Sequence, residues 1–175
     1  MGFIAVALPL EVRGMIPATF EYLAPQALPE AIALLEEHGA DAKILAGGHP
    51  LIPLMKLRLA APAYLKDINY IAGLKAIREA DGLLRIGALV RDADLEESEL
   101  LRKRCAGPVE ASRTLADPLV LNLATVGGNL VHADPANDHP AVMPALNAAL
   151  VATGPAGTRT IPLFLLLRLP EPIRA

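Results

Sequence analysis

Two glycine pairs, Gly47-Gly48 and Gly127-Gly128, interrupt mostly apolar stretches and constrain the fold more than any other feature. Glycine adopts positive φ and lets the backbone approach another group closely. Successive exposed N–H groups at such a turn make a concavity that suits phosphate oxygens. The pairs therefore predict two phosphate-binding loops. An ordinary turn is an equally good explanation of a single Gly-Gly pair.

The segments around the first pair alternate between strand and helix patterns. Strands are expected at 19–24, 42–46 and 63–68. A helix is expected at 28–38, because Pro29 stands in its first turn and Gly39 just past its end. A second helix is expected at 51–60. Residues 15–70 are thus predicted to form a first, β-α-β-α-β lobe, with the Gly47-Gly48 loop at the carboxyl end of a strand.

The rest of the chain, residues 71–175, predicts a second lobe. Asp81-Gly82 between alternating apolar residues indicates a hairpin. Helices are expected at 92–104, 108–122 and 138–148, and a loop around the second glycine pair. Two strands around a glycine-containing turn are expected at 149–163.

Composition excludes several classes of protein. Apolar residues make up 53% of the chain, so a folded core is expected. The net charge is −3 and no basic cluster stands out, which argues against a nucleic-acid partner. Cys105 is the only cysteine, so the chain cannot hold an iron–sulfur cluster alone. No transmembrane segment is expected, because the apolar stretch Phe3–Leu10 is too short. Residues 1–14 are interpreted as an N-terminal extension before a natural start at Met15.

Other constellations are weaker. His132, Asp134, Asp138 and His139 could form a metal cluster, but their loop spacing around Pro135 does not favour one shared face. A hydrolase would need a nucleophile on a strained turn, and no serine stands in such a motif. No metal ligand and no catalytic side chain is therefore predicted.

Two longer motifs point further. "AGGHPLIPLMKLRLAAP" at 46–62 and "TVGGNLVHADPANDHPAVMPALNA" at 125–148 resemble the two signatures of the flavoprotein subunit of molybdenum hydroxylases. That family includes the medium subunit of aerobic carbon monoxide dehydrogenase and the middle domain of xanthine dehydrogenase. "AGGH" and "NDHPAV" are most similar to the carbon monoxide dehydrogenase type. The similarity runs in order from Met15 to Ile161.

The resemblance implies an α+β, two-lobed FAD-binding fold of the vanillyl-alcohol oxidase and molybdenum hydroxylase type, lacking the C-terminal lobe. In that family the two loops together hold the FAD pyrophosphate, and an Asp after the second loop also contacts FAD. Carried over by motif, the FAD-binding residues expected here are Ala46, Gly47, Gly48, His49, Pro50, Leu51, Thr125, Gly127, Gly128, Asn129 and Asp138.

The resemblance also implies a role. The chain is expected to be the FAD-binding electron-transfer subunit of a carbon-monoxide-dehydrogenase-like molybdenum hydroxylase, passing electrons from iron–sulfur clusters through FAD to an external acceptor. Its expected partners are a molybdopterin-containing large subunit and a two-iron two-sulfur small subunit in a hetero-oligomer. The expected location is the cytoplasm, peripheral at the inner membrane through the complex.

A second hypothesis stays open: a truncated, flavin-free interaction or scaffold module of the same fold. Three departures from the family pattern favour it. Pro50 stands where the family has Ser, Leu121 stands where it commonly has Arg, and the C-terminal lobe is missing.

Overall fold

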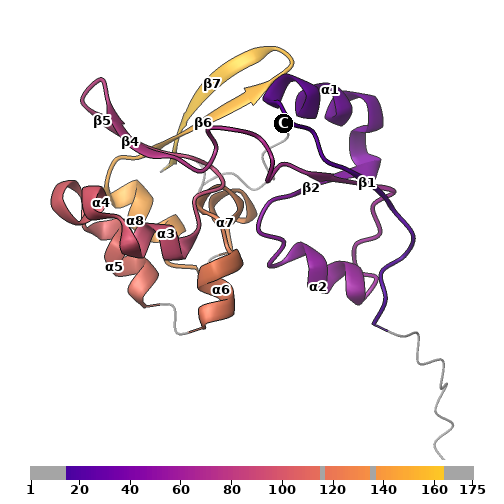
Figure 1. Ribbon diagram of the computed structural model, residues 1–175, viewed down its shortest axis with the longest axis horizontal. Coiled ribbons are helices and arrows are strands. Elements are labelled where there is room, and N and C mark those ends of the chain that lie inside the picture. The colour runs from indigo at the N-terminus through magenta and orange to yellow at the C-terminus, as the bar shows by residue number, and fades with distance from the viewer. Residues whose placement is uncertain (1–14, 115–116, 135–136, 164–175) are drawn as a thin grey trace, which may run out of the picture.

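Three parallel strands form the first sheet of the computed structural model, which describes residues 15–114, 117–134 and 137–163. The strands are β1 (Glu21–Leu23), β2 (Ala42–Leu45) and β3 (Tyr64–Asp67), with β3 in the middle. Helices α1 (Leu28–His38) and α2 (Leu51–Lys56) lie on opposite faces of this sheet (Figure 1). The predicted β-α-β-α-β order is confirmed. The predicted extension 1–14 lies outside the described residues.

Local chemistry explains where these two helices end. Helix α1 ends at Gly39, whose φ is 49° and whose N–H donates to Leu35 O. A one-turn 3-10 helix, η1 (Gly39–Asp41), then leads into β2. Helix α2 is shorter than predicted, because Arg58 takes a φ of 57° and turns the chain out of the helix.

A second group of elements follows residue 70. Hairpin β4 (Ile77–Ala80) and β5 (Leu83–Ile86) turns at Asp81 and Gly82, whose φ values are 54° and 71°. This is the two-residue turn that the sequence predicted. Hairpin β6 (Ala149–Gly154) and β7 (Gly157–Pro162) also confirms its prediction.

Two predicted helices are each broken in two. The first becomes α3 (Asp92–Glu97) and α4 (Glu99–Arg104), because Ser98 has a ψ of 106° and its hydroxyl accepts from Leu101 N. The second becomes α5 (Gly107–Arg113) and α6 (Pro118–Leu123). Asp117 caps α6 by accepting from Leu119 N, and Pro118 suits the first helical position.

The loop predicted around the second glycine pair is wrong in part, because it contains helix α7 (Val126–His132). Thr125 caps this helix with its side chain, and Ala133 ends it in the left-handed region. Helix α8 (His139–Ala145) follows, within the range predicted for it. The Thr125 cap thus helps to offset the low helix propensity of two glycines.

The core of the second group lies between its helices and its two hairpins. Its buried residues are Val90, Leu95, Leu101, Val109, Val126, Leu130, Met143 and Leu163. Side chains from all four hairpin strands pack against them. Only three Phe and three Tyr occur in the sequence, so aliphatic residues and one Met fill this core.

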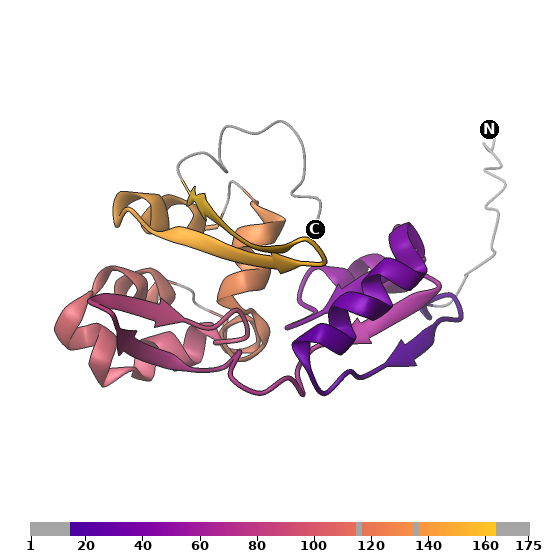
Figure 2. The same ribbon diagram turned by 90° about the horizontal axis from the view of Figure 1, so that it is seen from above.

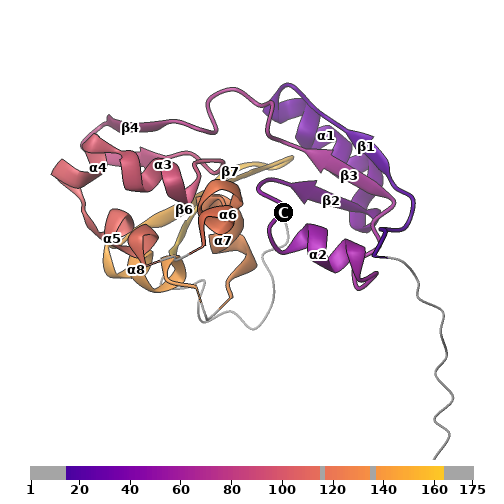
Figure 3. The same cartoon turned by 60° about the horizontal axis from the view of Figure 1, so that its bottom comes forward.

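The two groups of elements lie side by side. Helices α6 and α7 lie next to the loop that follows β2 (Figure 3), and hairpin β6–β7 reaches toward the first group (Figure 2). We call the first group, β1 to β3 with α1 and α2, the first lobe, and the remaining elements the second lobe. The domain boundary near residue 70 stays a prediction.

Candidate cofactor-binding site

The two glycine loops meet at Gly47. A Cβ built on Gly47 would lie 1.7 Å from the carbonyl oxygen of Leu123 and 3.3 Å from the Cα of Ala124. Leu123 and Ala124 directly precede Thr125 and the second glycine pair. The close approach of the backbones therefore requires glycine at position 47, and it joins the loop of one lobe to the loop of the other.

The first loop, by which we mean residues 46–51 with the first residue of α2 included, offers a row of backbone donors. Within the described residues, no acceptor is found for the N–H groups of Gly47, Gly48, His49 and Leu51. Gly48 has a φ of 73°, which glycine adopts without strain. His49 and Pro50 are exposed. Such a row of unpaired N–H groups suits an anion.

Pro50 is compatible with the fold of this loop. It is the N-cap residue of α2 with a φ of −80°, close to the value that its ring imposes. A serine there would find no N–H to cap at the third helical position, because that residue is Pro53. Compared with the serine that the resemblance predicts, Pro50 lacks two donors, the hydroxyl and the backbone N–H, but its φ fits the local backbone.

The second loop is the first turn of α7, and its N–H groups are largely used inside the protein. Val126 N donates to Val90 O and Gly127 N donates to Ala88 O, both at 2.9 Å. Gly128 N donates to the Thr125 hydroxyl at 3.3 Å. The open nest that the sequence suggested at this pair is therefore closed by neighbouring backbone.

The two glycines of this turn have different surroundings. A Cβ on Gly127 would lie 2.7 Å from the Cβ of Ala88, so Gly127 serves packing within the second lobe. A Cβ on Gly128 would meet only the Thr125 hydroxyl, at 2.8 Å, and Gly128 is exposed. Next to it, Asn129 Oδ1 is buried and has no hydrogen-bond partner within the described residues. Gly128 and Asn129 are thus the residues of this turn that are placed to meet a ligand.

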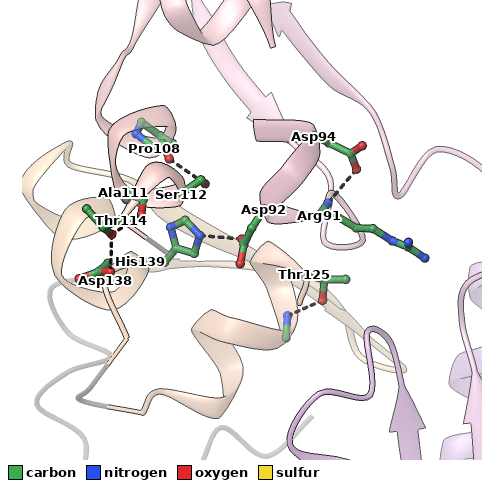
Figure 4. Close-up of polar contacts among 11 residues, drawn as sticks. Arg91, Asp92, Asp94, Pro108, Ala111, Ser112, Thr114, Thr125, Asp138 and His139 are labelled. Atoms are coloured by element: carbon green, nitrogen blue, oxygen red, sulfur yellow. Dashed lines mark hydrogen bonds and ion pairs between the residues drawn. The ribbon is translucent and has the colours of Figure 1, made fainter. Parts of the chain in front are cut away.

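Asp138 lies apart from the two loops. Its Oδ2 accepts from the Thr114 hydroxyl at 2.8 Å, and that hydroxyl also lies 2.6 Å from Ala111 O. Figure 4 shows Asp138 and Thr125 on opposite sides of the buried residues Asp92 and His139. The structure therefore brings together the predicted residues of the two loops, but it does not bring Asp138 to them.

A buried Asp–His pair supports the second loop. His139 Nε2 lies 2.7 Å from Asp92 Oδ1, and the two side chains are 1% and 0% exposed (Figure 4). Asp92 N also donates to Ala124 O, and Arg91 pairs with Thr125 in a β-bridge. His139 was considered in the sequence only as a metal ligand. No group of three or more metal-binding side chains occurs in the part of the chain that the structure describes.

A second network supports the first loop. Tyr22 donates to Asp67, and Asn69 donates both to Asp67 and to Ala46 O. Burial would raise the pKa of the Asp67 carboxyl, but hydrogen bonds from Tyr22 and Asn69 outweigh it and lower the pKa. The sequence analysis missed these residues. For Asp67 and Asn69, the signal was their position at the carboxyl end of β3, a strand parallel to β2, because carboxyl ends of parallel strands share one edge.

One more buried charge lies in the first lobe. Lys66 on β3 is fully buried, and its ammonium donates to the backbone carbonyl of Leu34 on α1. Burial lowers the pKa of Lys66.

Among the described helices, none is long and apolar enough to cross a bilayer.

Comparison with known proteins agrees with this geometry. The family described as the FAD-binding domain in molybdopterin dehydrogenase matches residues 18–172. The carbon monoxide dehydrogenase medium chain of Hydrogenophaga pseudoflava is 49% identical over 148 residues, which are 85% of this chain and 52% of that relative. The alpha subunit of the 6-hydroxypseudooxynicotine dehydrogenase complex of Paenarthrobacter nicotinovorans is 41% identical. The matched residues are 87% of this chain and 52% of that subunit.

Solved structures give the same result. A chain of carbon monoxide dehydrogenase from Hydrogenophaga pseudoflava superposes with a TM-score of 0.83 at 48% identity, covering 85% of this chain and 52% of its own. A chain of quinoline 2-oxidoreductase from Pseudomonas putida 86 superposes with a TM-score of 0.80 at 32% identity. The superposition covers 84% of this chain and 51% of the quinoline 2-oxidoreductase chain. The chain spans about half the length of these relatives. On the family match, the sequence identity and the shared fold, it belongs to the FAD-binding domains of molybdopterin dehydrogenases.

Proposed function

We propose that this chain is the FAD-binding, electron-transferring part of a molybdenum hydroxylase similar to carbon monoxide dehydrogenase. The observation that carries the proposal is the contact at Gly47. It holds the donor row of the first loop against the start of α7, so that one elongated ligand can touch both loops.

The residues of both loops fit FAD. The four unpaired N–H groups of the first loop suit the oxygens of a pyrophosphate. Asn129 Oδ1 is a buried acceptor that no donor reaches among the described residues, and a hydroxyl of the cofactor would satisfy it. Gly128 presents backbone without a side chain at the surface, which permits close approach. Asp138 enters the proposed site through the family resemblance alone.

The protein's part in such a reaction is to bind and orient. FAD, when bound, couples one-electron to two-electron transfer. The first loop holds the phosphates, the start of α7 holds the other side, and no side chain has to act as acid, base or nucleophile. Substrate oxidation would occur in a molybdopterin-containing large subunit, and a small subunit with two-iron two-sulfur clusters would deliver the electrons. An acceptor outside the chain would receive them.

A titration of the intact chain with FAD, followed by flavin fluorescence and absorbance, tests the proposal. The wild-type chain should bind FAD. Gly128→Val should weaken binding by about tenfold or more, equivalent to about 1.4 kcal/mol, because the branched side chain would occupy the surface at which the cofactor approaches.

Gly154→Val is the matched control, since a Cβ at Gly154 meets nothing within 4 Å and the residue lies in β6. It should bind FAD as the wild type does. Full flavin occupancy in a stably folded Gly128→Val variant would contradict the assignment of this turn to the cofactor.

A flavin-free scaffold module is the second candidate. One observation favours it: the N–H groups of Val126 and Gly127 already have acceptors in the protein, so the second loop offers fewer donors than the family signature suggested. The same titration separates the two functions. A wild-type chain that folds and shows no binding of FAD would favour the scaffold.

A further inference from the structure

Side chains from two strands meet beneath the first loop, at the edge of the sheet where all three strands end. Asp67 is the last residue of β3, and Asn69 follows it by two. Tyr22 comes from β1, which pairs with β3 on the side opposite to β2. None of these residues belongs to either glycine motif.

Asn69 is tied at three points. Its Nδ2 donates to Ala46 O at 2.8 Å and to Asp67 Oδ1 at 2.7 Å. Its backbone N donates to the same Asp67 oxygen at 2.9 Å. Because a side-chain amide has two N–H donors, both are used, and the orientation of the amide is determined.

Asp67 is held in turn by β1. Tyr22 donates its hydroxyl to Asp67 Oδ2 at 2.6 Å, so both carboxylate oxygens accept hydrogen bonds. The Asp67 side chain is nearly buried, with 8% of its residue surface exposed. Hydrogen bonds to an ionised acceptor are stronger than those between neutral groups. The chain of contacts therefore runs from β1 through β3 to the end of β2.

We propose that Asn69 is a positioning residue that holds the first loop in its cofactor-binding shape; this inference rests on the function proposed above. The peptide group is planar and trans, so the Ala46 carbonyl and the Gly47 N–H point in opposite directions. By binding Ala46 O, Asn69 turns the Gly47 N–H away from the sheet. The backbone carbonyl of Leu123 also lies close to Gly47, which leaves this peptide little freedom to rotate.

Amide hydrogen exchange of the intact chain without FAD tests the positioning directly. In Asn69→Ala, the amides of Ile52 and Leu54, which donate to Gly48 O and Pro50 O of the loop, should exchange about 3- to 10-fold faster, the factor equivalent to one net hydrogen bond. Asn69→Asp should behave alike, because a carboxylate cannot donate to Ala46 O. Asn69→Gln keeps the amide and should recover part of the protection.

Two further variants keep the result interpretable. Tyr22→Phe removes one hydroxyl from a half-exposed ring, so it should fold, and it should accelerate exchange of the same amides by a smaller factor. Gln26→Ala removes a side-chain to backbone bond, from Gln26 Nε2 to Ala24 O at 3.0 Å, and should leave exchange at Ile52 and Leu54 unchanged.

Unchanged exchange at Ile52 and Leu54 in both Asn69→Ala and Asn69→Asp would overturn the proposal. So would a uniform acceleration over β2 and β3, which would mean that Asn69 only stabilises the sheet. FAD titration of the same variants gives the second measurement, and affinity should fall by the same factor as protection. If neither wild type nor variants bind FAD, the proposed function fails while the exchange result still decides the role of Asn69.

Discussion

At the scale of single residues, the glycines of the two motifs do different work. The missing side chain of Gly47 leaves room for a carbonyl oxygen of the other lobe, and that of Gly127 leaves room for Ala88. Gly128 is exposed at the surface. A motif with two Gly-Gly pairs would suggest four equivalent phosphate contacts. The positions of the neighbouring atoms show that two of the four glycines are required by packing.

Gly47→Ala should therefore be more harmful than an ordinary glycine substitution. Its methyl group would overlap Leu123 O, and overpacking of this kind costs about 1–3 kcal/mol. We expect a lower thermal midpoint and weaker FAD binding. Gly154→Ala, whose Cβ has free space, is the control and should keep the stability of the wild type. Equal stability of the two variants would mean that the loops do not approach so closely in solution.

At the scale of elements, a buried Asp–His pair joins α3 to α8. Asp92 and His139 are fully buried, and Asp92 Oδ2 and His139 Nδ1 have no partner within the described residues. Because Asp92 also follows the bridge between Arg91 and Thr125, the pair supports the segment that caps α7. Removing one partner would leave a buried polar group uncompensated.

A double-mutant cycle on this pair tests its contribution. Asp92→Leu and His139→Leu should each lower the free energy of unfolding by about 3 kcal/mol or more. The double variant should cost less than the sum, with a coupling of about 2 kcal/mol, measured by urea denaturation. Arg85→Met, which breaks the exposed pair with Asp81, should change stability by about 1 kcal/mol or less. Additive losses at Asp92 and His139 would show that the two side chains do not interact.

At the scale of the whole molecule, the network of Tyr22 and Asp67 makes stability depend on pH. The pKa of Asp67 is lowered, so its contribution is present above the ordinary value of 3.8 and is lost as pH falls through the lower folded value. The hydrogen bond to Asp67 raises the pKa of Tyr22 above 10.0. Its contribution is present below that pH and is lost as pH rises through the raised value.

Tyr22→Phe should remove the Tyr22 effect and the part of the Asp67 effect that comes from the Tyr22 hydroxyl, while the bonds from Asn69 remain. The difference in unfolding free energy between wild type and variant should stay constant between about pH 5 and 9. It should shrink below about pH 4, where Asp67 becomes protonated in the unfolded chain, and again above about pH 10, where Tyr22 ionises in the unfolded chain. Urea denaturation across this range gives the measurement. A difference that stays flat down to about pH 3 would contradict the coupling of Tyr22 to Asp67.

The sequence by itself determined the features that depend on neighbours along the chain. Helix α1 begins near Pro29 and ends at Gly39, because each of these residues acts on the backbone of its own turn. Asp81 and Gly82 make the hairpin turn because two adjacent residues can take positive φ. The strand and helix order of the first lobe and the FAD-binding family followed from local patterns and motifs in the same way.

Only the tertiary structure decided which contacts the residues of the two motifs make, because these contacts join residues far apart in sequence. Asn69 reaches Ala46 over 23 residues, and His139 reaches Asp92 over 47. The first turn of α7 is held by Val90 O and Ala88 O, which accept from Val126 N and Gly127 N. No local pattern specifies such partners, since they depend on how the lobes pack. That packing made Gly47 the point where the lobes meet and left the donors of the first loop free.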